Sequence, residues 1–143
     1  MPKLLIVDDD ANVLMTTQAL FEDAGFTVLT RNAAIGTSQV VLQHRPDAVL
    51  LDVEMPGLGG RELARLLLDL PRMRVALFLF SGMDRPELER TAAELGALGA
   101  LHKSMSPRLM VDEVRMMLEH WRRRSSATID LRQSEPPSAR RKA

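Results

Sequence analysis

Four short apolar runs constrain the fold of this chain most strongly, because each one ends at a polar side chain. The runs and the residues that follow them are Lys3–Val7 before Asp8, Ala48–Leu51 before Asp52, Ala76–Phe80 before Ser81, and Ala97–His102 before Lys103. Runs of this kind, separated by segments with helical spacing, are typical of strands buried in a parallel sheet. In open parallel sheets, ligands bind just beyond the carboxyl ends of the strands. The sequence therefore predicts a site at which these polar side chains converge.

Segments with helical spacing alternate with the apolar runs and give five strand–helix units. Predicted strands cover residues 4–7, 26–30, 48–52, 75–81 and 100–102, and predicted helices cover 11–24, 33–44, 61–70, 86–95 and 107–121. We expect Asp10 to be the N-cap of the first helix and Ser106 that of the last. This alternation predicts an α/β fold, namely a flavodoxin-like, doubly wound (βα)5 sandwich with a five-stranded parallel sheet.

The chain divides by composition into an acidic body and a basic tail. Residues 1–121 hold 12 basic and 17 acidic residues, whereas residues 122–143 hold seven basic and two acidic ones and are rich in Ser, Arg and Pro. Because the apolar pattern fades after Trp121, we place one domain at residues 1–121 and a disordered tail at residues 122–143. An acidic body with a basic tail is not the charge pattern of a DNA-binding domain.

The sequence also bears on the compartment in which the chain works. No apolar run approaches the roughly 20 residues that a membrane-spanning helix needs, and none follows a basic N-terminus as in a signal peptide. The chain contains no Cys, which excludes disulfides and thiolate metal sites and suits a reducing compartment. We therefore expect a cytoplasmic protein without membrane contact.

The polar side chains at the predicted sheet edge have a chemistry in common. Carboxylates about 4 Å apart repel each other by roughly 4 kcal/mol at an effective dielectric constant near 20, so a cluster of them needs a cation. Mg²⁺ suits such a site because it takes few protein ligands and keeps several waters. The cation and Lys103 would neutralise a transferring phosphoryl group, and Ser81 would donate a hydrogen bond to it. A positioned carboxylate can itself be the nucleophile and form an aspartyl phosphate.

In this order the motifs resemble the receiver domain of two-component response regulators, over about residues 3–121. In that family an acidic pair ends the first strand, as Asp8 and Asp9 do here. The phosphoacceptor ends the third strand, which matches Asp52, and the following Val-Glu-Met-Pro-Gly is similar to the family's D-x-x-M-P-G. A Ser or Thr ends the fourth strand, matching Ser81, and a Lys follows the fifth strand, matching Lys103.

The resemblance implies a site and a function. It implies Mg²⁺ held by Asp9, Asp52 and the main-chain carbonyl of Glu54, with Asp8 in support. It implies a chain that is not an enzyme acting on another substrate, but one limited to Mg²⁺-dependent self-phosphorylation and slow autodephosphorylation. The partners it implies are a sensor histidine kinase or a histidine phosphotransfer protein. Since no second domain fits after residue 121, we expect a single-domain response regulator that signals by protein–protein contact or phosphorelay.

Two departures from the family pattern leave an alternative open. The family usually carries Tyr or Phe where this chain has Ala100, and Pro where it has Ser104. The alternative function is therefore a receiver-fold interaction module that acts independently of phosphorylation. A third hypothesis, an aspartyl-phosphate phosphatase of the haloacid dehalogenase type, is disfavoured because that chemistry needs an Asp where this chain has Glu54.

Overall fold

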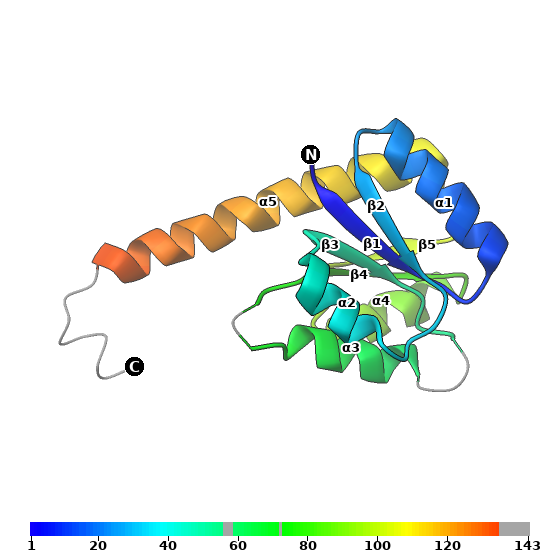
Figure 1. Ribbon diagram of the computed structural model, residues 1–143, viewed down its shortest axis with the longest axis horizontal. Coiled ribbons are helices and arrows are strands. Elements are labelled where there is room, and N and C mark those ends of the chain that lie inside the picture. Colours follow the sequence, from blue (N-terminus) through cyan, green and yellow to red (C-terminus); the bar gives the residue numbers. More distant parts are fainter. Residues whose placement is uncertain (56–58, 72, 135–143) are drawn as a thin grey trace.

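Five parallel strands form one sheet at the centre of the molecule (Figure 1). The computed structural model describes residues 1–55, 59–71 and 73–134. The strands are β1 (Lys3–Val7), β2 (Thr27–Arg31), β3 (Ala48–Leu51), β4 (Ala76–Ser81) and β5 (Gly99–His102). Their order across the sheet is β2-β1-β3-β4-β5, which is the flavodoxin-like order. The predicted fold class is therefore confirmed.

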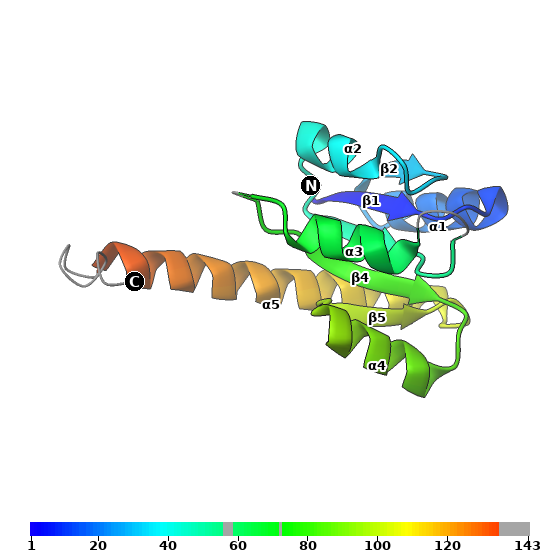
Figure 2. The same ribbon diagram turned by 90° about the horizontal axis from the view of Figure 1, so that it is seen from below.

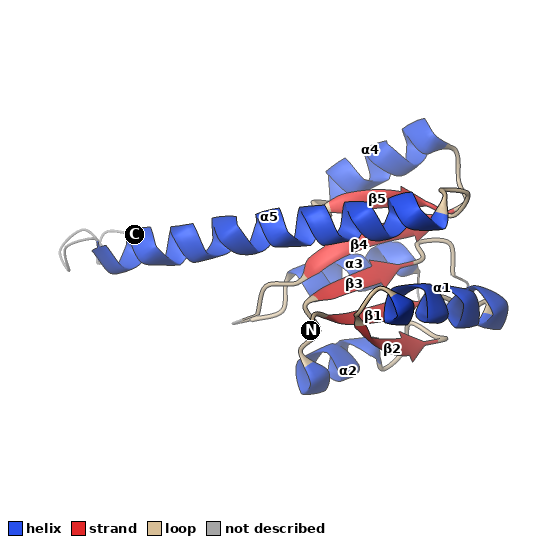
Figure 3. Cartoon of the chain, turned by 90° about the horizontal axis from the view of Figure 1, so that it is seen from above, coloured by secondary structure: helices blue, strands red, loops and turns tan. Residues whose placement is uncertain are grey.

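Helices cover both faces of this sheet. They are α1 (Ala11–Asp23), α2 (Thr37–His44), α3 (Gly60–Leu68), α4 (Arg85–Leu95) and α5 (Pro107–Ser134). Figure 3, seen from above, shows α1 and α5 lying across one face, and Figure 2, seen from below, shows α2, α3 and α4 on the other. Each helix is the crossover between two parallel strands or the continuation of the last one, as parallel pairing requires.

The alternation of side chains along each strand produces two separate cores. In β1, Leu4 and Ile6 pack in the core under α1 and α5, whereas Leu5 and Val7 pack in the core under α2, α3 and α4. Successive strand residues point to opposite faces of a sheet. Because helices cover both faces, every position of β3 and β4 and residues 4–7 of β1 are buried, which explains why these central strands are continuous apolar runs.

Side-chain caps fix where two of the helices begin. The Asp10 carboxylate accepts hydrogen bonds from the main-chain N–H groups of Asn12 and Val13, at 2.9 and 3.3 Å. The Ser106 hydroxyl accepts one from the N–H of Leu109 at 3.3 Å. Both predicted N-caps are thus confirmed, and each satisfies N–H groups that have no partner within the helix.

One predicted helix starts later than expected. We predicted a helix from residue 33, but α2 begins at Thr37, after Gly36 with a φ of 84°. That left-handed backbone conformation interrupts a right-handed helix and is open to glycine at little cost. The Thr37 hydroxyl donates a hydrogen bond to the carbonyl of Ala33 at 2.7 Å, which closes the turn before the helix.

The last helix continues past the predicted domain boundary. We placed that boundary after residue 121, but α5 extends to Ser134, and Figure 1 shows its distal part projecting away from the sheet. Arg122 pairs with Asp47 at 2.5 Å, and Arg123 pairs with Glu119 one turn earlier at 2.6 Å. The pair of Arg123 with Glu119 has the i,i+4 spacing at which ion pairs support a helix, so the fading apolar pattern does not mark the end of the helix. The rest of the predicted tail, residues 135–143, lies outside the described residues.

No helix in the part of the chain that the structure describes is long and apolar enough to cross a bilayer.

The backbone around Gly60 leaves no space for a side chain. A Cβ at this position would lie 2.5 Å from the Cα of Val53 and against the Asp52 carbonyl. We expect Gly60→Ala to lower the free energy of unfolding by about 1–3 kcal/mol, since neither backbone can yield without moving α3 or β3. Urea unfolding followed by circular dichroism measures this. Gly59→Ala is the control, since no heavy atom lies within 4 Å of its Cβ position. Equal effects of the two changes would contradict the prediction.

Candidate functional site

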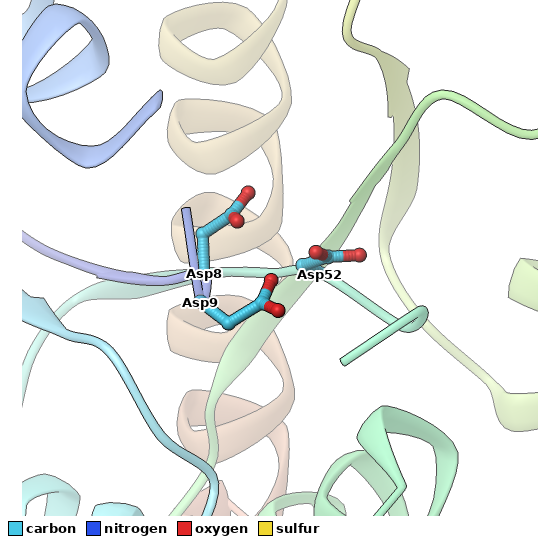
Figure 4. Close-up of side chains that lie close together, drawn as sticks. All are labelled: Asp8, Asp9 and Asp52. Atoms are coloured by element: carbon cyan, nitrogen blue, oxygen red, sulfur yellow. The ribbon is translucent and has the colours of Figure 1, made fainter. Parts of the chain in front are cut away.

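Three carboxylates meet at the carboxyl ends of β1 and β3. These strands are neighbours with Val7 opposite Leu51, and the N–H of Asp52 donates to the carbonyl of Val7 at 2.9 Å. The next residues of each strand, Asp8, Asp9 and Asp52, therefore come together, with carboxylate oxygens within 4.8 Å of one another. Figure 4 shows the Asp9 carboxylate extending toward Asp52. The convergence of these three side chains follows directly from the strand order.

Lys103 brings one positive charge into this cluster. It follows β5, and its Nζ lies 2.7 Å from Asp8 Oδ2 and 3.3 Å from Asp52 Oδ2. To reach them, the side chain crosses the end of β4, where Nζ lies 5.4 Å from the centre of the Phe80 ring. Three carboxylates then face one ammonium group. The cluster therefore keeps a net negative charge that a bound cation can offset.

Asp52 and Lys103 both have shifted pKa values. Burial raises the pKa of Asp52 above its usual value, with a contribution from the charge of Asp8, and this outweighs the lowering by the Glu54 N–H and by Lys103. Burial alone would lower the pKa of Lys103, but its hydrogen bond to Asp8 and the charges of both carboxylates raise that pKa. Lys103 thus stays charged at neutral pH, while ionised Asp52 is held at a cost in desolvation.

The carboxylates differ in how many of their oxygens are already engaged. Asp8 is fully buried, and its Oδ1 accepts a hydrogen bond from the N–H of Asp10 at 3.0 Å while Oδ2 faces Lys103. Asp52 Oδ1 accepts one from the N–H of Glu54 at 2.8 Å. Asp9 is exposed and forms no ion pair with any described residue. Asp9 is therefore the carboxylate most available to a metal ion.

Ser81 is joined to the cluster through Glu54. Its hydroxyl, fully buried at the end of β4, donates a hydrogen bond to Glu54 Oε1 and accepts one from the N–H of Met83 at 3.1 Å. From the sequence we expected only the main-chain carbonyl of Glu54 at the site, and we missed the contact of its side chain with Ser81. No pattern in the sequence indicates it, because a Glu in a polar loop is ordinarily solvated.

The structure therefore brings together all the side chains that the sequence singled out. Asp8, Asp9, Asp52 and Lys103 lie in direct proximity, and Ser81 is one side chain away. The Pro-Gly part of the D-x-x-M-P-G-like motif, residues 56–57, lies outside the described residues.

Ala100 and Ser104, the two departures from the family pattern, lie on and after β5. Ala100 lines a small cavity of about 120 Å³ with Leu88 and Met105. The Ser104 N–H donates a hydrogen bond to His102 Nδ1 at 3.1 Å.

Comparisons with known proteins agree with this geometry. The chain is 28% identical over 117 residues to the aerobic respiration control protein ArcA of Escherichia coli K12, covering 82% of this chain and 48% of ArcA. It thus spans about half the length of that relative. It is 26% identical over 113 residues to sporulation initiation phosphotransferase F of Bacillus subtilis, covering 79% of this chain and 87% of that protein.

A solved structure and a family match lead to the same assignment. A response regulator receiver protein from Burkholderia phymatum superposes with a TM-score of 0.74 at 30% identity, covering 83% of this chain and 96% of that one. Residues 4–115 match the response regulator receiver domain family. With the strand order and the acidic cluster described above, this match shows that the chain belongs to the response regulator receiver domain family.

Proposed function

We propose that this chain acts as a response regulator receiver domain that accepts a phosphoryl group on Asp52. The observation that carries the proposal is the position of Asp52, whose Oδ2 lies 3.3 Å from the Lys103 ammonium at the end of β3, inside a cluster of carboxylates. A carboxylate in such surroundings can act as a nucleophile toward phosphorus. A histidine kinase or histidine phosphotransfer protein is the proposed phosphodonor.

Each side chain of the site has a role in this reaction. An oxygen of Asp52 attacks phosphorus, the bond from phosphorus to the donor's imidazole nitrogen breaks, and its electron pair stays on that nitrogen. Lys103 neutralises charge that develops on the phosphoryl oxygens, and Ser81 donates a hydrogen bond to one of them. Asp8, Asp9, Asp52 and the main-chain carbonyl of Glu54 would hold a Mg²⁺ ion, which would supply further positive charge. The oxygen-only donor set fits this ion.

The same residues define the limits of the chemistry. Asp52 is consumed by the phosphoryl group and regenerated by hydrolysis, so the chain undergoes self-phosphorylation and slow autodephosphorylation without turning over another substrate. The signal then leaves by contact with another protein or by passing on the phosphoryl group. Exposed apolar side chains on α5, Leu109 at 57% and Met116 at 64% exposure, offer one surface for such contact.

A second candidate function is an interaction module that works without phosphorylation. The observation that favours it is Ala100, a small side chain beside an open cavity on the face formed by α4, β5 and α5. Because the Ala100 side chain is small, it makes few packing contacts through which phosphorylation of Asp52 could alter that face. Unchanged partner binding by Asp52→Asn would favour this candidate.

Phosphorylation is tested by incubating the protein with Mg²⁺ and acetyl phosphate and measuring its intact mass. We expect an adduct of one phosphoryl group on the wild type and none on Asp52→Asn. Asp10→Asn is the matched control, because it removes one carboxylate next to the site while Asn remains a good N-cap. No adduct on the wild type with several small phosphodonors would contradict the proposal.

Metal binding is tested by stability in the presence of a chelator and of Mg²⁺. Without metal, Asp52→Asn should raise the free energy of unfolding by about 1 kcal/mol, because it removes a carboxylate with a raised pKa from a negative cluster. At a hundredfold excess over its Kd, Mg²⁺ should stabilise the wild type by about 2.7 kcal/mol, and the variant by less. Thermal unfolding that responds to neither change would rule out the metal site.

A further inference from the structure

We propose that the Glu54 carboxylate occupies the Ser81 hydroxyl by accepting its hydrogen bond, and that this bond has to break when Asp52 is phosphorylated. We call this hydrogen bond the latch. The inference rests on the proposed function and adds a residue to it. Glu54 is a positioning residue in this proposal: it acts on the reaction through the Ser81 hydroxyl, and not by contact with the phosphorus atom.

The hydrogen-bonding capacity of Ser81 is the first step of the argument. A serine hydroxyl has one O–H to donate, and Ser81 donates it to Glu54 Oε1. The same oxygen accepts from the N–H of Met83 at 3.1 Å, and the residue is fully buried. Ser81 can therefore donate to a phosphoryl oxygen only after its bond to Glu54 has broken.

The second step concerns which of the two partners moves. Glu54 is exposed, and its carboxylate forms no ion pair with any described residue, so it can turn into solvent at low cost. Ser81 is held by the sheet, where its carbonyl accepts from the N–H of Lys103 at 2.9 Å. The latch therefore opens by movement of the Glu54 side chain, while Ser81 stays in place.

The third step links the latch to the phosphoacceptor. The main-chain N–H of Glu54 donates to Asp52 Oδ1 at 2.8 Å, so one residue contacts both the nucleophile and the hydroxyl. A phosphoryl group on Asp52 would place negative charge next to the Glu54 carboxylate, and like charges at this range repel. Phosphorylation thus both requires and favours release of Glu54.

The test is the initial rate of phosphorylation by acetyl phosphate, with the Mg²⁺ concentration saturating for each variant. Hydrogen bonds to charged groups are among the stronger ones, so Glu54→Ala should react about tenfold faster than the wild type. Glu54→Gln keeps an acceptor oxygen for Ser81 but loses the charge, so it should react at a rate between those of the wild type and of Glu54→Ala. Glu62→Ala, an exposed carboxylate in the first turn of α3, should change nothing.

The double variant separates the latch from a simple charge effect. If Glu54 acts through Ser81, Glu54→Ala should have no effect on the rate when Ser81 is already alanine. An equal acceleration in the Ser81→Ala background would overturn the proposal, because it would show that only the charge of Glu54 matters. In the unphosphorylated protein, the ¹³C resonance of the Glu54 carboxylate should shift in Ser81→Ala, and an unchanged resonance would also overturn it.

The outcomes also separate this inference from the proposed function. An adduct that forms at the same rate on the wild type and on Glu54→Ala overturns the latch and leaves Asp52 as phosphoacceptor. No adduct on any variant overturns both.

Discussion

The ion pair that Lys103 forms with Asp8 and Asp52 is the interaction on which the site depends. Asp8 is fully buried, and an ionised carboxylate without a partner is among the most costly groups to bury. The ammonium group lies 2.7 Å from Asp8 and 3.3 Å from Asp52, so it compensates both. Lys103 follows β5, and β4 lies between β5 and β3 in the sheet. The ion pair therefore connects the end of β5 to the ends of β1 and β3. Removing the Lys103 ammonium would leave both carboxylates without a compensating charge.

The ion pair does not balance the charge of the cluster completely. Asp9 adds a third carboxylate without a partner among the described residues, and burial raises the pKa of Asp52. The folded chain therefore holds a carboxylate in a less favourable state than it would have in water. A bound cation would relieve that state by supplying positive charge. The order in the sheet places this unfavourable site where a partner can reach it.

The strands and the acidic cluster could be predicted from sequence because their causes are local and repetitive. Burial on both faces turns β1, β3 and β4 into continuous apolar runs, and the residue after each run has to lie at the same sheet edge. The N-caps at Asp10 and Ser106 have a similarly local cause. The contact between Glu54 and Ser81 could not be predicted, because it depends on the rotamer of an exposed side chain. The length of α5 was missed because apolar spacing reports packing and gives no signal where a helix leaves the domain.

The lack of space around Gly60 has a consequence for how α3 responds to Asp52. A Cβ at this position would meet the backbone of Val53 and the carbonyl of Asp52, so the first turn of α3 packs directly against the main chain of the two residues that follow β3. The glycine serves here to provide clearance, and its conformational freedom is not used, because α3 begins with helical backbone. Two backbones in such contact have no side chain between them to absorb a displacement. A displacement of the Asp52 main chain would therefore be transmitted through this contact to the first turn of α3.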